Sequence, residues 1–274
     1  MSAKPRTLVI RTAGTNCDAE LCRAFEMAGS VVELVHVDAL IAAPSRLDAF
    51  DLIGFPGGFS YGDDIASGRI MAMKLREKLY PALRNAAARG CLMIGVCNGF
   101  QTLVQCGLLP GPRAGESWPP EPPEQRCSLT DNAGGRFVDR WVGIEAPSSS
   151  VCIWTRGLSE VGENASERAD LLQLPAAHGE GRFVCRTPAD LAEFERTGQV
   201  ALRYSDNYNG SENAIAGICD PSGRIFGLMP HPERYLDWTR HPYWTRLPTA
   251  LKKGPTPGAM FFRNAVEAAV SVNA

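Results

Sequence analysis

The chain has 274 residues, of which 45% are apolar and 21% are charged, so its length and composition allow a sizeable core in a soluble globular protein. The formal net charge is −2 with acids and bases interspersed, which argues against a nucleic-acid-binding protein and against binding to an anionic membrane surface. The first apolar stretch ends at Arg11 and no window approaches ~18 apolar residues, so the sequence predicts neither a signal peptide nor a membrane-spanning helix.

Nine cysteines are scattered along the chain, several of them inside apolar runs, and no two form a C-x-x-C pair. Zinc sites and redox-active dithiols usually contain such pairs, so we expect no metal site and no cofactor in this chain. Reduced thiols in a cytoplasmic protein are the simplest interpretation of this cysteine usage.

Strand and helix patterns alternate over the first hundred residues. The predicted strands are 7–11, 31–37, 52–55 and 91–96, and the predicted helices are 18–28, 65–79, 81–89 and 98–106. Gly29, Gly90 and Gly107 follow three of these helices, as glycine commonly does after a helix end. Continuous apolar strands that alternate with helices indicate a mostly parallel sheet covered on both faces.

The second half of the chain has an antiparallel character. A Pro-rich segment over about 110–126 predicts a long surface loop. The strands predicted after it are 136–145, 151–155, 199–204, 214–219 and 224–229, the last two joined by a hairpin turn at 220–223. A final helix is predicted at 259–272, within a C-terminal extension over about 235–274. We therefore expect an α/β fold in one domain, 1–274, with a mixed, mostly parallel central sheet flanked by helices.

Cys97 lies at the junction between the strand at 91–96 and the helix that follows it. Gly95 and Gly99 flank it at two residues on either side, where a tight strand-to-helix turn brings the backbone close together. Such a turn places a sulfur at a helix N-terminus, which favours the thiolate, and leaves the amide of Asn98 able to donate to an oxyanion. A buried core cysteine is the commoner interpretation of any single cysteine, but the two glycines and the junction favour a nucleophile.

A cysteine nucleophile needs a base, and His231 is the best candidate among the four histidines. It follows the strand at 224–229 and has a proline on each side, which places it on a rigid loop at a strand end, where active sites of open α/β sheets gather. Glu233 could orient its imidazole as the acid of a triad does. The alternative is a capping histidine beside a solvated glutamate. His36 is interpreted as a half-buried structural residue and His241 as a residue without a catalytic role.

Gly57 and Gly58 follow the buried strand at 52–55, at the edge of the same predicted sheet as Cys97. A Gly-Gly turn can point backbone N–H groups into a site with no side chain in the way, so we assign it the second oxyanion donor beside Asn98. Taken alone, such a turn is more often a simple connection.

Six segments together resemble a known family. Residues 95–101 and 229–234 resemble the triad-type class I glutamine amidotransferases. Four further segments, 14–18, 56–63, 177–181 and 209–211, narrow the resemblance to the glutaminase subunits of phosphoribosylformylglycinamidine synthase. The resemblance covers about 7–235, and the motifs occur in the family's order.

This resemblance implies a flavodoxin-like sheet, a Cys97–His231–Glu233 triad and a γ-glutamyl thioester on Cys97. It also implies that Gln101 helps to hold the bound L-glutamine, and that His178, Gly179 and Glu180 border the glutamine site. A polar turn between strands is the alternative interpretation of that last segment.

The released ammonia is expected to pass to a partner. The chain has no Walker-type phosphate-binding motif, so ATP and magnesium are expected on another polypeptide. The resemblance implies that this polypeptide is the large synthase subunit, with a small third subunit in some complexes.

Three alternatives stay open at this stage. One is the same chemistry with another acceptor, as in guanine-nucleotide or carbamoyl-phosphate type amidotransferases. Another is a cysteine peptidase or stress-response hydrolase on a similar sheet. The last is a non-catalytic scaffold subunit that has kept the fold.

Overall fold

A nine-stranded mixed sheet forms the centre of the computed structural model, which describes residues 4–272. The ends of the predicted 1–274 domain, residues 1–3 and 273–274, lie outside the described residues. The sheet has the order β2-β1-β3-β4-β11-β10-β9-β6-β7. Its strands are β1 (Arg6–Arg11), β2 (Val31–His36), β3 (Leu52–Phe55), β4 (Leu92–Val96), β6 (Val138–Glu145), β7 (Gln173–His178), β9 (Val200–Tyr204), β10 (Ile215–Cys219) and β11 (Ile225–Leu228). A separate antiparallel pair consists of β5 (Cys127–Thr130) and β8 (Arg182–Cys185).

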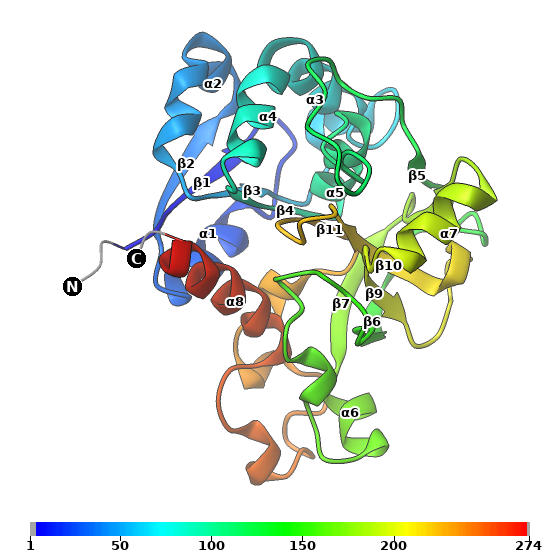
Figure 1. Cartoon of the computed structure of the whole chain (residues 1–274). Helices are drawn as coiled ribbons and strands as arrows, with labels where there is room; N and C mark the ends of the chain where they lie inside the picture. The colour runs from blue at the N-terminus through cyan, green and yellow to red at the C-terminus, as the bar shows by residue number, and fades with distance from the viewer. Residues whose placement is uncertain (1–3, 273–274) are drawn as a thin grey trace.

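Helices cover both faces of the parallel half of this sheet. These covering helices are α1 (Asp18–Met27), α2 (Val37–Ala42), α3 (Arg69–Lys74), α4 (Tyr80–Ala88), α5 (Asn98–Gln105) and α8 (Pro257–Val272). Two further helices, α6 (Ala165–Leu171) and α7 (Pro188–Arg196), belong to the second half of the chain. Helices α1 and α8 pack together on one face, and α3, α4 and α5 lie on the other (Figure 1). The predicted α/β class and mixed sheet are confirmed. None of the helices in the described part of the chain is both long and apolar enough to cross a membrane.

The register of the parallel strands determines where the chain leaves the sheet. Strands β3, β4 and β11 run parallel and side by side, with Phe55 opposite Gly95 and Leu228 opposite Val96. All three are buried along their whole length, which explains their continuous apolar sequences. The segments that follow them therefore emerge together at one sheet edge.

The predicted strand at 151–155 is wrong. This segment is a buried turn, and the N–H groups of Val151 and Ile153 donate to the carbonyls of Gly198 and Gly223 instead of to a strand ladder. Trp154 is fully buried and its indole donates to the Arg224 carbonyl. A short apolar run indicates burial, but its periodicity alone does not distinguish a strand from a buried loop.

The predicted helix at 65–79 begins later, at Arg69. Tyr61 and Asp63 have positive φ angles of 55° and 52°, so an irregular loop occupies the segment before it. Helix α3 then continues through one π-helical turn, Leu75–Leu79, into α4. Pro81 lacks the N–H that a regular α-helical bond would need there, which accounts for the wider turn.

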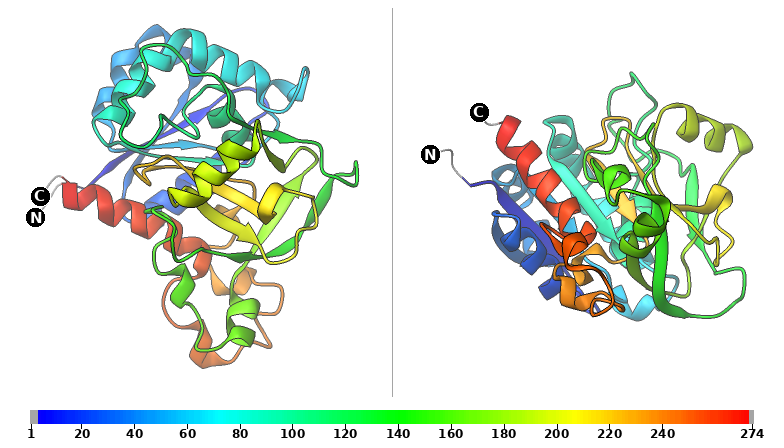
Figure 2. Two further views of the ribbon diagram at one scale, coloured as in Figure 1. Left: turned by 45° about the vertical axis from the view of Figure 1, so that its right-hand side comes forward. Right: turned by 90° about the horizontal axis from the view of Figure 1, so that it is seen from below.

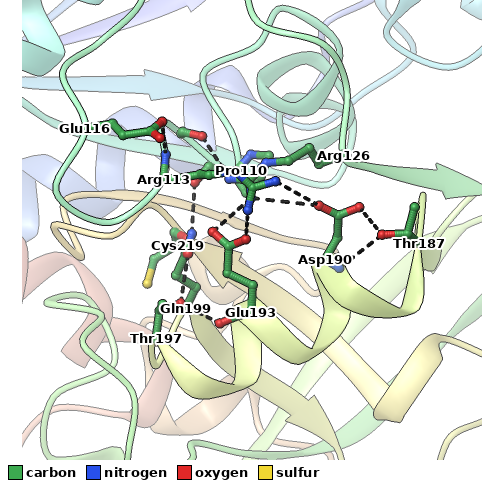
Figure 3. Close-up of polar contacts among 11 residues, drawn as sticks. Pro110, Arg113, Glu116, Arg126, Thr187, Asp190, Glu193, Thr197, Gln199 and Cys219 are labelled. Atoms are coloured by element: carbon green, nitrogen blue, oxygen red, sulfur yellow. Dashed lines mark hydrogen bonds and ion pairs between the residues drawn. The ribbon is translucent and has the colours of Figure 1, made fainter.

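The Pro-rich segment is a surface loop, as predicted, and polar side chains fix both of its sides. Tyr80 donates to the carbonyl of Pro119, and Gln199 donates to the carbonyl of Pro110. Beyond these contacts, a group of four charged residues that we call the Arg126 cluster joins the loop to α7 (Figure 3). Its members are Arg113, Arg126, Asp190 and Glu193.

The part of the C-terminal extension that precedes α8, together with α6, forms a small lobe that projects away from the sheet (Figure 2). His241 is buried and hydrogen-bonds the carbonyl of Asp170, at the end of α6, at 2.7 Å. Its ring and that of Tyr235 also pack against Trp141. His241 therefore has a structural role here, joining α6 to the aromatic residues Trp141 and Tyr235.

Candidate active site

Cys97 occupies a strained turn between β4 and α5. Its backbone has φ 52° and ψ −109°, a conformation that residues with side chains rarely adopt. A Cβ on Gly95 would lie 2.6 Å from the carbonyl oxygen of Gly99, and a Cβ on Gly99 would lie 1.9 Å from that of Phe55. Both glycines are therefore required by close backbone contact, as the sequence predicted, and the start of α5 packs directly on the end of β3.

His231 follows β11, the parallel neighbour of β4. Its backbone N–H donates to the Pro175 carbonyl at 2.7 Å, and its Nδ1 lies 2.7 Å from Glu233 Oε1. Both side chains are 2% exposed. The carboxylate thus fixes the imidazole with Nε2 directed away from Glu233, the arrangement that a general base requires.

The pKa of His231 is raised well above its ordinary value. Burial opposes the charged imidazolium, but the carboxylate of Glu233 outweighs it, assisted by the sulfurs of Cys17 and Cys97. The same carboxylate therefore favours the imidazolium that forms whenever His231 accepts a proton.

Cys97 and His231 converge above Gly57. A Cβ on Gly57 would lie 2.8 Å from His231 Cε1 and 3.4 Å from Cys97 Cβ, so the missing side chain leaves the space in which the two residues approach. They do not form a hydrogen bond of normal geometry: His231 Nε2 has no partner among the described residues, and Cys97 Sγ donates to the Ala177 carbonyl at 3.6 Å. The structure thus brings the predicted nucleophile and the predicted base together, without a direct hydrogen bond between them.

The segment with Gly57 and Gly58 is held against α5. Gly58 has φ 139°, and a Cβ there would strike Asn16 N at 2.7 Å, so this turn excludes side chains. Asn98 fastens the segment, since its Oδ1 accepts from Ser60 N at 3.2 Å. The predicted oxyanion residues Gly57, Gly58 and Asn98 therefore lie around Cys97.

Gln101 and Glu180 are in direct contact one helical turn beyond Cys97. Gln101 Nε2 donates to the Glu180 carbonyl oxygen at 2.5 Å, and its Oε1 accepts from Asn98 Nδ2 at 3.1 Å. The Glu180 carboxylate accepts from Ser67 Oγ at 3.0 Å. The structure thus brings these two predicted substrate-site residues together on one wall of the site.

His178 ends β7, and both of its ring nitrogens are engaged. Nδ1 lies 3.1 Å from Asn132 Oδ1, and Nε2 lies 2.6 Å from the Tyr208 hydroxyl. Burial, with a smaller contribution from the nearby His231, lowers the pKa of His178 to about 4, so the ring is neutral. Gly179 accepts from Asn132 N at 2.8 Å. These contacts suit His178 for shaping the pocket wall more than for proton transfer.

Sequence reasoning gave no role to Cys17, which the structure places beside His231. Its Sγ accepts from Arg234 Nη2 at 3.0 Å, and its backbone N–H donates to the Gly57 carbonyl. The segment 14–18 stood out in the sequence, but only the fold brings Cys17 to a histidine that lies 214 residues later. His36 also differs from expectation: it is exposed at the end of β2 and caps α2 by accepting from Asp38 N.

Comparison with known proteins gives a consistent result. Residues 4–267 match the family described as the CobB/CobQ-like glutamine amidotransferase domain. Phosphoribosylformylglycinamidine synthase subunit PurQ from Dehalococcoides mccartyi is 41% identical over 97% of this chain and 98% of its own length. The protein of the same name from Methanococcus maripaludis is 36% identical over 96% of this chain and 97% of its own length.

Solved structures show the same fold. A chain in the structure of PurLQS from Thermotoga maritima has a TM-score of 0.67 and 32% identity, covering 97% of this chain and 99% of its own. A glutamine amidotransferase from the same organism has a TM-score of 0.52 at 14% identity, covering 98% of this chain and 99% of its own, which shows the fold alone.

Proposed function

This chain belongs to the CobB/CobQ-like glutamine amidotransferase family, and from that premise we propose that it is the glutaminase subunit of a phosphoribosylformylglycinamidine synthase. It hydrolyses L-glutamine and supplies ammonia to an ATP-dependent synthetase partner in purine biosynthesis. The observation that carries the proposal is the match to the PurQ subunit of Dehalococcoides mccartyi, at 41% identity over almost the full length of both chains.

Cys97 acts as the nucleophile in this proposal. His231 takes its proton, and the thiolate attacks the side-chain carbonyl carbon of glutamine. Glu233 holds the imidazole in the required tautomer and stabilises the imidazolium that forms, which its 2.7 Å contact and complete burial support.

The oxyanion that develops is stabilised by the backbone amides of Asn98 and of the turn at Gly57 and Gly58. Loss of one such donor costs roughly 10²–10³ in rate in other acyl-transfer enzymes. Gln101, His178, Gly179 and Glu180 form the wall that positions the substrate. The fixed contacts of Gln101 and His178 support this assignment because they leave the wall little freedom to move.

Collapse of the tetrahedral intermediate completes the first half of the reaction. The C–N bond breaks, the imidazolium gives its proton to the departing ammonia, and a γ-glutamyl thioester forms on Cys97. Water, deprotonated by His231, then attacks the thioester and releases glutamate and the free thiol. The nucleotide chemistry with ATP and magnesium belongs to the synthetase partner.

The lack of a direct hydrogen bond between Cys97 and His231 suggests that the isolated chain is a slow glutaminase. We propose that the large synthetase subunit, together with a small third subunit, closes this pair on binding. The complex named PurLQS from Thermotoga maritima, which contains a similar chain, is the precedent for such a partner. We place the complex in the cytoplasm, in keeping with nine free cysteines.

A reconstitution experiment tests this function. The purified chain is mixed with a formylglycinamide ribonucleotide synthetase subunit, and glutamate release and formylglycinamidine ribonucleotide formation are measured with and without ATP. We expect co-elution and a rise in glutamine turnover when the partner is added. Cys97→Ser should abolish both products but retain co-elution. Unchanged turnover with the partner, or ammonia delivery only to a different acceptor enzyme, would contradict the proposal.

A further inference from the structure

Cys17 is a second thiol beside the catalytic base. It is 1% exposed at the start of α1, and a Cβ on Gly57 would lie 3.3 Å from its sulfur and 2.8 Å from His231 Cε1. One potential ligand atom from each of Cys17, His231 and Glu233 lies within 4.8 Å of the other two. A thiol, an imidazole and a carboxylate are thus gathered at one buried point.

Two buried polar atoms in this group have unused hydrogen-bonding capacity. Among the described residues, His231 Nε2 and Glu233 Oε2 have no hydrogen-bond partner, although both side chains are 98% buried. Leaving a buried polar atom unpaired costs about 1–3 kcal/mol, so such atoms call for a ligand. The proposed glutaminase reaction uses Nε2 but gives no role to Oε2 or to the Cys17 sulfur.

We propose that Cys17 Sγ, His231 Nδ1 and the Glu233 carboxylate form a binding site for a soft divalent metal ion of the zinc class, and that a bound ion inhibits the glutaminase. Nδ1 is the imidazole ligand because it faces the carboxylate at 2.7 Å, whereas Nε2 points away from it. Zinc prefers sulfur, imidazole and carboxylate ligands at about 2.0–2.3 Å, which places tetrahedral ligand atoms roughly 3.5 Å apart. Ligand atoms that already lie within 4.8 Å of one another reach this geometry by small side-chain rotations. A water molecule would complete the tetrahedron.

Inhibition follows from the ligands that the ion takes. The Cys17 thiol releases its proton to solvent when zinc binds, and zinc takes His231 as the neutral imidazole, because metal ligands must be deprotonated. An imidazole held by zinc can no longer accept the proton of Cys97. The inhibitory half of the inference rests on the proposed function, whereas the binding half does not.

Arg234 is a built-in competitor for the ion. Its guanidinium lies 3.0 Å from the Cys17 sulfur and is partly exposed, with Glu20 at 3.7 Å as an alternative partner. Replacing the thiol proton by Zn²⁺ raises the charge at Cys17 by one unit, so a neighbouring cation weakens binding. Substitution of Arg234 should therefore strengthen zinc binding, even though the guanidinium is then no longer present to stabilise the Cys17 thiolate.

Zinc affinity is measured by competition with a chromophoric chelator on the full chain, with Zn²⁺ alone as the probe. The variants are Cys17→Ser, Arg234→Gln and Cys97→Ser, with Cys22→Ser as the matched control from the same helix. Co²⁺ titration of each variant reports thiolate ligation through its charge-transfer band. Thermal unfolding without metal shows that each variant is folded. Glutamate release is followed separately with Zn²⁺ and after chelator addition.

We expect one zinc ion per chain and a loss of affinity in Cys17→Ser that exceeds the ~10–100-fold cost of losing an outer-shell partner. Arg234→Gln should bind roughly tenfold more tightly. Cys22→Ser and Cys97→Ser should bind as the unmodified chain does, and the thiolate band should vanish only in Cys17→Ser.

The assigned site would be overturned if Cys17→Ser bound zinc as tightly as the wild type, or if Arg234→Gln gained no zinc affinity. It would also be overturned if Cys97→Ser lost as much zinc affinity as Cys17→Ser. Because binding is measured on the inactive Cys97→Ser chain as well, failure of the site and failure of the glutaminase function give different results. Zinc binding without chelator-reversible inhibition would overturn the inhibitory half.

Discussion

The Arg126 cluster and the group around Cys97 are both partly or fully buried and carry charged side chains, but they differ in how completely their interactions are made. In the Arg126 cluster, Arg126 pairs with Glu193 at 3.1 Å and donates to the Gly111 carbonyl at the same distance, and Arg113 pairs with Glu193 as well. Around Cys97, by contrast, the backbone is strained and His231 Nε2 and Glu233 Oε2 lack partners among the described residues.

The difference separates a structural cluster from a reactive one. The ion pairs of the Arg126 cluster fasten the Pro-rich loop to α7 (Figure 3). In the proposed reaction, the site at Cys97 keeps His231 Nε2 without a protein partner because this atom must exchange protons with Cys97 and the substrate. Burial and charge are common to both clusters, so unused hydrogen-bonding capacity is the feature that distinguishes the proposed active site from the structural cluster.

The sharpest test of this comparison exchanges one carboxylate in each cluster for an amide. Glu233→Gln keeps the shape of the side chain but removes the charge that raises the pKa of His231. We expect kcat for glutamine hydrolysis to fall by roughly 10³–10⁴, as it does when the acid of a related triad becomes an amide. Steady-state glutaminase assays of the reconstituted complex measure it.

Glu193→Gln is the matched control for that exchange. It should lower the denaturation midpoint, because Arg126 loses a buried partner, and leave kcat within about twofold. Equal effects of the two substitutions on kcat would mean that the two clusters do not differ in function.

Gly57→Ala probes the shared space in the reactive cluster. The added methyl would lie 2.8 Å from His231 Cε1 and must displace the imidazole. We expect a loss of about 10² in kcat, because small misplacements of a catalytic group carry costs of this size. Gly62→Ala in the same loop has open space around the new methyl but a φ of 73° that strains it, so it serves as the control for loop strain without displacement of the imidazole. A drop of the same size in both variants would assign the effect to loop conformation.

Arg126→Met tests whether the Arg126 cluster contributes to stability and not to activity. Arg126 is 12% exposed, and its removal leaves Asp190 and Glu193 less well compensated, so unfolding free energy should fall by about 3 kcal/mol. Arg113 is 52% exposed, and Arg113→Met should cost no more than about 1 kcal/mol because solvent screens its pairs. Urea denaturation gives both values, and glutaminase activity of the folded variants should not change. A larger loss of unfolding free energy in Arg113→Met than in Arg126→Met would mean that Arg113, and not Arg126, holds the cluster together.

His178 should produce a pH dependence of stability. Burial lowers its pKa to about 4, so the unfolded chain binds more protons than the folded one between about pH 4 and 6.5. Stability therefore rises with pH over this window, by about 2 kcal/mol between pH 5 and 7. Urea denaturation at the two pH values should show a shallower dependence in His178→Gln, and an unchanged slope would contradict the assignment.

The features that the sequence predicted well are those that neighbouring residues determine. Gly95 and Gly99 identified the turn at Cys97 because the backbone contact they permit is local. Two prolines around His231 marked the loop that carries the base. The parallel strands were predicted because burial on both faces makes their sequences continuously apolar.

The features that were missed depend on contacts between distant segments. Strand β7 contains Pro175, which is tolerated because β7 lies at the sheet edge, a position that no local pattern reveals. The buried turn around Trp154 was predicted as a strand, because its apolar residues indicated only burial. Cys17 reaches His231 only through the register of the whole sheet.

Covalent labelling with an electrophilic glutamine analogue tests the central claim, that Cys97 is the nucleophile. The reconstituted complex is labelled, digested and mapped by mass spectrometry, with the Cys97→Ser chain in parallel. We predict one label per chain, on Cys97, loss of glutaminase activity in step with labelling, and no label or turnover in Cys97→Ser. Labelling of another cysteine, or continued glutamate release by Cys97→Ser, would contradict it.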